Sequence, residues 1–299
     1  MGRDDDLCLP CLIAWAGNSK GIPGITILDE IARGGMGVVS YAEQALPKRL
    51  VAIKTLHTHL VTDGLLVSRF RQETQVMADL EHPCILPVYE MGNFEGIPWY
   101  TMKLARNGSL ASRIADFANK WKTISLFIAR ISDALDHMHR HGVLHRDVKP
   151  GNILFDHDDL AYLSDFGLAN QFSAQSEQPS VTLGPSLLGT PAYLAPELAS
   201  GNVQDATPRS DIYSLSAVLY ELLVGRMPYP SLPLPLLLPW IAQKALTPLA
   251  DIDSKIPRDL QRICEKGMAR NPQLRYASAS AMADDLRRFH HDSVFVNLR

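Results

Sequence analysis

The sequence predicts an α+β protein of two parts, a small β-rich unit followed by a larger and mainly helical one. Two observations predict this fold class. Strand-like runs dominate up to about residue 104, and from residue 123 onwards apolar residues recur at helical spacing. Strands that come first and helices that come later favour two lobes. A chain of 299 residues is long enough to give such a domain a sizeable core.

The first part contains five strand-like runs and one helix. Apolar residues at helical spacing predict the helix over residues 64–80, and Pro83 closes it. Residues 1–24 are rich in acidic and punctuating residues, and we expect them to form an N-terminal tail. The strand signals are Ile25–Leu28, Val38–Tyr41, Leu50–Ile53, Ile85–Met91 and Ile97–Leu104.

The second part is predicted to be helical. Helices are expected at residues 123–141, at Ile212–Val224 before Gly225, and twice within 256–290 around Asn271-Pro272. The change of pattern places a hinge at about residues 103–106. We therefore expect a smaller lobe at 25–103, a larger lobe at 107–290 and a C-terminal tail at 291–299, so that one domain spans residues 25–290.

The charge balance argues against polyanionic partners. The chain has 29 Lys and Arg against 32 Asp and Glu, a formal net charge of −3. A protein that binds nucleic acid or an anionic membrane surface through its overall charge would be basic. We therefore expect no nucleic-acid partner.

The cysteines and the hydropathy pattern predict a soluble, cytoplasmic chain with no membrane segment. Four cysteines in 299 residues are too few and too scattered for a disulfide framework. No run reaches the ~20 apolar residues that a membrane helix requires. The best candidate, Leu232–Ile241, is broken by three prolines.

A glycine-rich segment lies between the first two strand signals. It reads Ala32, Arg33, Gly34, Gly35, Met36, Gly37, Val38, Val39. Glycines let backbone N–H groups approach phosphates closely. The segment opens no helix and lacks the Gly-Lys-Ser/Thr ending, which disfavours a dinucleotide fold and a P-loop ATPase. A glycine turn in an ordinary hairpin is the alternative for this segment alone.

A second segment carries the groups that phosphoryl transfer needs. Residues 145–152 read His-Arg-Asp-Val-Lys-Pro-Gly-Asn, and Asp165-Phe166-Gly167 follows eighteen positions after Asp147. The two segments supply an acid/base carboxylate, a cation and two side chains that can ligate a metal. Asn152 and Asp165 offer oxygen ligands, which Mg²⁺ prefers.

Together with Ala195-Pro196-Glu197, these motifs resemble the signature of protein kinases. The resemblance covers roughly residues 25–290 and implies the bilobal kinase fold. The family pattern has a glycine where this chain has Ala32, whereas Gly34, Gly37 and Val39 match. Gly-Gly-Met-Gly, Leu-Leu-Gly-Thr-Pro-Ala-Tyr and Arg275-Tyr276-Ala277-Ser278 are similar to bacterial, eukaryotic-like Ser/Thr kinases.

The resemblance implies roles for single residues of the larger lobe. Asp147 would accept or orient the proton of the substrate hydroxyl, and Lys149 would neutralise the γ-phosphate. Asn152 and Asp165 would hold Mg²⁺ or Mn²⁺, and Thr190 would bridge the catalytic Asp and Lys, as in the Ser/Thr-specific branch. Asp211 would brace the catalytic loop. Glu197 and Arg275 would form an ion pair.

The smaller lobe and the hinge would bind ATP. Lys54 would contact the α- and β-phosphates and pair with a helix carboxylate, for which Glu73 is a better candidate than Glu81. Met102 would be the gatekeeper, and Lys103 and Ala105 would present backbone groups to adenine. The nucleotide-binding set is completed by Ala32, Arg33, Gly34, Gly35, Met36, Gly37, Val39 and Ala52.

The resemblance predicts a Ser/Thr protein kinase with ATP, protein substrates and a second copy of itself as partners. The second copy would phosphorylate the activation segment 168–194, at Thr182 with Ser186 and Ser180 as alternatives. A nucleotide-binding pseudokinase or scaffold is the first alternative, and a small-molecule kinase of the same fold is the second. Basic substrates are not predicted, because Gly151 stands where many basophilic relatives carry an acidic residue.

Two further clusters could suggest metal sites. His137, His139, His141 and His145 lie within nine residues, but a helix end that leads into the catalytic loop explains them better than zinc does. Cys8 and Cys11 could be half of a zinc site, but a closed site takes four ligands and the chain has no second such pair. Two free thiols are the favoured interpretation.

Overall fold

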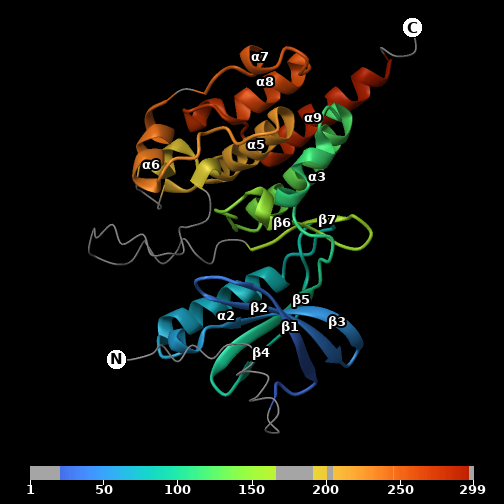
Figure 1. The fold of residues 1–299 in the computed structure, drawn as a ribbon, viewed down its shortest axis with the longest axis vertical. Coiled ribbons are helices and arrows are strands. Elements are labelled where there is room, and N and C mark those ends of the chain that lie inside the picture. Colours follow the sequence, from blue (N-terminus) through green and yellow to red (C-terminus); the bar gives the residue numbers. More distant parts are fainter. Residues whose placement is uncertain (1–20, 166–190, 201–204, 245, 296–299) are drawn as a thin grey trace. The chain divides into compact units, whose positions relative to one another are not determined.

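A computed structural model describes residues 21–165, 191–200, 205–244 and 246–295, and in residues 191 and 292–295 the backbone only. These residues form two compact units. The first comprises 21–81 and 86–106. The second comprises 82–85 and the described residues from 107 onwards (Figure 1).

The first unit is built on a five-stranded antiparallel sheet of order β1-β2-β3-β5-β4. The register matters for the site because residues directly opposite one another in neighbouring strands share a face of the sheet. Val39 lies opposite Lys54, which lies opposite Tyr100. The strands are β1 (Ile25–Arg33), β2 (Gly37–Ala45), β3 (Lys48–Leu56), β4 (Val88–Phe94) and β5 (Ile97–Lys103).

One face of this sheet carries an apolar cluster, and the other carries Lys54 and a helix. Val51 and Ile53 of β3 pack with Ile25, Ala42 and Trp99 on the first face. Because strand side chains alternate, Lys54 points to the opposite face. There α2 (Gly64–Ala78) packs, with the Phe70 ring 5.5 Å from that of Tyr100. The helix starts at Asp63, whose carboxylate accepts the N–H groups of Leu65 and Leu66.

The second unit is mainly helical, as predicted. Its core is formed by α3 (Trp121–Arg140), which packs against α5 (Pro208–Val224) and α9 (Ala279–Phe295) (Figure 1). The predicted end of α5 is confirmed, since Gly225 caps it with φ 79°. The remaining elements are the hairpin β6 (Ile153–Phe155) and β7 (Ala161–Leu163), and the helices α4 (Pro196–Ala199), α6 (Leu234–Gln243), α7 (Leu249–Ile252) and α8 (Arg258–Gly267).

Two details differ from the sequence-based expectation. The predicted strand 85–91 begins only at Val88, because Ile85 is used elsewhere: it forms an isolated bridge with Leu163 in the second unit. The proline-rich run 232–241, for which no helix was predicted, forms most of α6, with Pro239 inside the helix. Pro235 is tolerated there because it stands in the first turn, where backbone N–H groups have no helical partner. Within the described ranges, no helix combines the length and apolar character needed to span a bilayer.

Candidate active site

The hairpin β6–β7 brings the two candidate metal ligands together. Ile153 pairs with Leu163, so Asn152 and Ser164 stand next to each other at the open end of the hairpin. The Ser164 N–H and hydroxyl both donate to the Asn152 carbonyl, at 2.9 and 3.2 Å. Asp165 follows directly, with φ 54°. Residues that are thirteen positions apart in the sequence are thereby held side by side.

Asp147 is bonded on one side only. Lys149 Nζ donates to Asp147 Oδ2 at 2.7 Å, and Asn152 Nδ2 donates to the same oxygen at 2.9 Å. Asp147 Oδ1 accepts no hydrogen bond from the described residues, and the side chain is 42% exposed. The carboxylate is therefore oriented by a cation and an amide while its second oxygen is open to an incoming hydroxyl.

The Asn152 amide suits a hard cation. Its Nδ2 group donates to both the carbonyl and the carboxylate of Asp147, at 2.8 and 2.9 Å. These bonds use both amide protons and leave Oδ1 as the free acceptor among the described residues. An amide oxygen from Asn152 and a carboxylate from Asp165 are the kinds of ligand that Mg²⁺ or Mn²⁺ takes.

His145 is a buried, neutral support of the loop. Its Nε2–H donates to the Ser164 carbonyl at 3.1 Å, and its Nδ1 accepts the Asp147 N–H at 3.2 Å. Burial lowers the pKa of the imidazole, and the nearby carboxylates of Asp211, Asp147 and Asp165 only partly offset this. The neutral ring with its proton on Nε2 satisfies both bonds.

Asp211, at the start of α5, holds the backbone of the catalytic loop as predicted. Its carboxylate accepts the N–H groups of His145 and Arg146, at 2.8 and 2.7 Å. His139 Nε2 also contacts it at 2.8 Å. Arg146 has φ 64°, which costs a non-glycine residue backbone energy. The three contacts with Asp211 stabilise this backbone conformation.

In the first unit, three of the predicted nucleotide-binding residues, Val39, Ala52 and Met102, share the face of the sheet that carries Lys54. Cross-strand pairing puts Val39 beside Lys54, and Ala52 beside Met102. Lys103 uses its N–H in a bond with the Pro87 carbonyl at 3.0 Å. The backbone groups of Ala105 bond to no described residue. Small and apolar side chains next to a lysine and an open backbone N–H suit a flat, polar-edged ring with a phosphate tail.

Glu73 lies on the side of α2 that faces this sheet. It stands three residues after Phe70 and four before Met77, both of which are buried. Residues at this spacing share one side of a helix. Glu81, the alternative candidate, lies beyond the end of α2 and is exposed. The geometry therefore favours Glu73 over Glu81.

The glycine segment divides into one position that requires glycine and others that do not. A Cβ at Gly37 would lie 2.1 Å from the Thr55 carbonyl oxygen, a backbone atom that cannot move aside. A Cβ at Gly34 would meet nothing nearer than 4.0 Å. Ala32, which replaces a family glycine, is exposed in β1 opposite Val39 and has no positive φ. Its methyl group is accommodated without strain.

The sequence analysis did not predict a role for His57, which donates two hydrogen bonds to the backbone of the glycine segment. Its Nε2–H donates to the Gly34 carbonyl at 2.7 Å, and its backbone N–H donates to the Met36 carbonyl at 3.0 Å. Within a trans peptide, the C=O and the following N–H point in opposite directions. His57 therefore turns the N–H groups of Gly35 and Gly37 away from itself. Only its place just after β3 could have suggested this.

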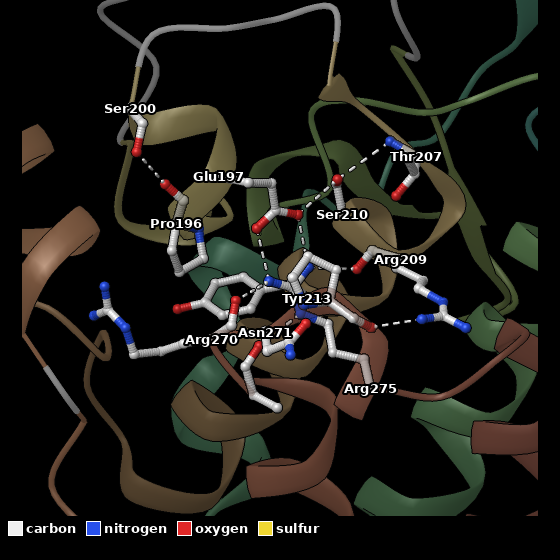
Figure 2. Close-up of polar contacts among 12 residues, drawn as sticks. Pro196, Glu197, Ser200, Thr207, Arg209, Ser210, Tyr213, Arg270, Asn271 and Arg275 are labelled. Atoms are coloured by element: carbon white, nitrogen blue, oxygen red, sulfur yellow. Dashed lines mark hydrogen bonds and ion pairs between the residues drawn. The ribbon is translucent and has the colours of Figure 1, made fainter.

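The predicted ion pair between Glu197 and Arg275 is present and buried (Figure 2). Two parallel bonds of 2.7 Å join the groups, and the Arg275 side chain is 0% exposed. The other guanidinium N–H groups donate to the carbonyls of Ala269, Arg209 and Arg270, so all five donors are satisfied. Burial is the largest single influence on Glu197 and raises its pKa, but the hydrogen bonds and charge of Arg275, a backbone hydrogen bond and the Ser210 hydroxyl together outweigh it, so the net pKa is lowered.

Several predicted residues lie outside the described residues. They are Thr190, Phe166 and Gly167, the candidate phosphorylation sites Thr182, Ser186 and Ser180, and Cys8 and Cys11. The two cysteines that are described, Cys84 and Cys264, are buried free thiols.

Comparisons with known proteins agree with this geometry. The model of the protein kinase domain matches residues 25–286. The serine/threonine-protein kinase PknH of Mycobacterium bovis is 35% identical over 254 residues, which cover 85% of this chain and 42% of PknH. PknE of Mycobacterium tuberculosis is also 35% identical, with coverage of 85% and 44%. This chain thus spans about two fifths of the length of these relatives.

The fold comparison gives the same result. The kinase domain of Mycobacterium tuberculosis PknI matches with a TM-score of 0.66 and 25% identity, covering 90% of this chain and 96% of that domain. The names of the relatives give no support to the pseudokinase alternative. The predicted fold is confirmed, and the chain belongs to the protein kinase domain family.

Proposed function

We propose that this chain transfers the γ-phosphate of ATP to Ser or Thr hydroxyls of proteins. The observation that carries the proposal is the geometry of Asp147: Oδ2 is held by Lys149 and Asn152, and Oδ1 is open. The names of the family members support Ser/Thr specificity.

Asp147 Oδ1 accepts the proton of the substrate hydroxyl. For this transfer the hydroxyl has to lie within hydrogen-bond distance of Oδ1. Lys149 already donates to Asp147 Oδ2, so its ammonium is placed next to the attacking oxygen and neutralises charge that develops on the transferred phosphate. Thr190, at the end of the activation segment, is assigned to bridging these two side chains.

The metal is assigned to Asn152 Oδ1 and the Asp165 carboxylate. When bound, Mg²⁺ or Mn²⁺ supplies positive charge to the phosphates of ATP. The Ser164 bonds to the Asn152 carbonyl hold the backbones of these two residues next to each other before the nucleotide binds.

The first unit is assigned to the nucleotide. Lys54 contacts the α- and β-phosphates and pairs with Glu73, which lies on the helix above the same face of the sheet. The segment from Ala32 to Gly37 covers the phosphates with its backbone N–H groups. Val39, Ala52 and Met102 contact the adenine ring, and the backbones of Lys103 and Ala105 bond to its edge.

We further propose that a second copy phosphorylates the activation segment at Thr182, with Ser186 and Ser180 as alternatives. The motive is Arg146 beside Asp147, because a phosphate with nearly two negative charges can bond to arginine and order a segment. The domain would extend over residues 25–290, with tails at 1–24 and 291–299.

Labelled ATP tests the proposal. The purified chain with Mg²⁺ and a generic protein acceptor should transfer label, whereas Lys54→Met and Asp165→Asn should lose it by hundreds-fold, since one such charge-stabilising group contributes ~3–4 kcal/mol. Unchanged melting temperatures would show that both variants fold. Turnover near that of the unsubstituted chain in either variant would refute the assignment of that residue.

A further inference from the structure

The histidines near the end of α3 separate into two groups with different surroundings. His139 and His145 belong to the catalytic loop, through Asp211 and Ser164. His137 and His141 contact each other on another side of α3, and His82, in the loop after α2, packs against His137. The catalytic arrangement therefore leaves three neighbouring imidazoles without a role.

His137 and His141 form a pair one helical turn apart. The His141 N–H still donates to the His137 carbonyl at 3.3 Å, so the α-helical spacing continues through both residues. Their ring centroids are 4.4 Å apart, and the His82 ring lies 5.4 Å from that of His137. Two histidines at i and i+4 on one helix side can bind one transition-metal ion together.

The hydrogen bonds of His137 and His141 leave a nitrogen lone pair on each ring that could bind a metal ion. His141 Nδ1 lies 2.8 Å from the His137 carbonyl, which can only accept, so the proton is on Nδ1 and the lone pair is on Nε2. A backbone carbonyl bonded to the second ring nitrogen is the usual support of a metal-bound histidine. His137 Nε2 is buried and has no hydrogen-bond partner among the described residues. A buried nitrogen without a partner calls for an explanation.

The surroundings of His137 favour its neutral form, the form in which an imidazole binds a metal. Burial is the largest cause that lowers the pKa of His137, followed by His141 and Arg140, while Asp136 opposes them. His82 is not counted as a ligand. Its Nδ1 accepts the Cys84 N–H at 3.1 Å, which places the proton of the neutral ring on Nε2.

We propose that His137 and His141 bind one divalent transition-metal ion, such as Zn²⁺, through their Nε2 atoms at the C-terminal turn of α3. Imidazole ligands suit Zn²⁺, Cu²⁺ and Ni²⁺ and do not favour Mg²⁺. The site is thus distinct in chemistry from Asn152 and Asp165. Water would complete the coordination on the side of the exposed His141, since the described residues offer two nitrogens to the ion.

A second cluster of possible metal ligands serves as a comparison for the proposed site. Asp156, His157 and Asp158, in the turn between β6 and β7, are the group of three already gathered closely enough for an ion among the described residues. However, Asp156 is committed to the turn: its carboxylate accepts the N–H groups of Asp158 and Leu160 and the Tyr162 hydroxyl. These bonds explain the cluster without a metal.

Calorimetric titration of the full chain with Zn²⁺ tests the proposal. Cys8 and Cys11 are both changed to Ser in every sample, and saturating Mg²⁺ occupies the oxygen ligands. We expect one Zn²⁺ per chain, at least tenfold weaker binding in His137→Ala and in His141→Ala, and unchanged binding in His157→Ala. Equal binding in all variants, loss in His157→Ala or no binding to the parent would each overturn the site.

Because His141 is exposed, His141→Ala decides the question even if His137→Ala fails to fold. Its melting temperature without Zn²⁺ should equal that of the parent. With Zn²⁺, the parent should melt at a higher temperature than His141→Ala, because an ion that binds only the folded chain stabilises it. His139 is left unchanged, since it contacts Asp211.

Discussion

Replacing Arg275 with Met should cost the second unit much of its stability. The guanidinium is fully buried and makes five hydrogen bonds, two of them to Glu197. Met fills a similar volume, but it leaves a half-buried carboxylate that has lost its cation and keeps a hydrogen bond from the Ser210 hydroxyl. Removing one partner of a buried ion pair typically costs ~3–5 kcal/mol.

In a unit of this size, such a loss corresponds to a fall in melting temperature of roughly 6–20 °C. Calorimetry or circular dichroism would measure it. Arg262→Met is the matched control, because Arg262 is 76% exposed and its contact with Asp259 is 3.4 Å long. The double variant Glu197→Gln with Arg275→Met should recover part of the loss, since it removes the stranded charge. If Arg275→Met melted like Arg262→Met, the account of this pair would be refuted.

Three further predictions concern the glycine segment and pH. Gly37→Ala should abolish the rise in melting temperature caused by ATP with Mg²⁺, because its methyl group would collide with the Thr55 carbonyl. Gly34→Ala should keep that rise, since its methyl group meets no close atom. Equal rises in the two variants would contradict this prediction. Because His57 holds the backbone of the glycine segment, His57→Ala should raise KM for ATP more than it lowers kcat. His57→Gln should restore KM, and His59→Ala should leave it unchanged. An unchanged KM in His57→Ala would contradict this prediction. Because the pKa of Glu197 is lowered by folding, its ionised form stabilises the fold above the unfolded-state value near 4.3, and this contribution is lost as the pH falls through the folded-state pKa. The difference in melting temperature between the unsubstituted chain and Glu197→Gln should therefore shrink in acid, and a constant difference would contradict the reasoning.

The fold class followed from the sequence because strand and helix signals fall in separate halves of the domain. The end of α5 was predictable from Gly225, whose φ of 79° suits glycine. The start of β4 was not, since Ile85 is as apolar as a strand residue but is buried and paired with Leu163 outside the sheet. Periodicity cannot distinguish these two kinds of burial.

The site was predictable where chemistry depends on residue type and spacing, as for Asp147, Lys149, Asn152 and Asp165. It was not predictable where a role depends on tertiary contact. His57 carries no motif, and its two bonds arise from the turn between β1 and β2. The sequence alone does not distinguish the histidines at the end of α3 from one another. Their tertiary contacts do, because His139 contacts Asp211 whereas His137 packs against His82.

The identity of the phosphorylated residue in an acceptor protein tests the central claim most directly. The unsubstituted chain would be incubated with labelled ATP, Mg²⁺ and the acceptor, and the acceptor hydrolysed in acid to its phosphoamino acids. The account predicts phosphoserine or phosphothreonine that depends on Mg²⁺ and is absent with Asp147→Asn. ATP binding without any transfer, or label found only in phosphotyrosine, would contradict it.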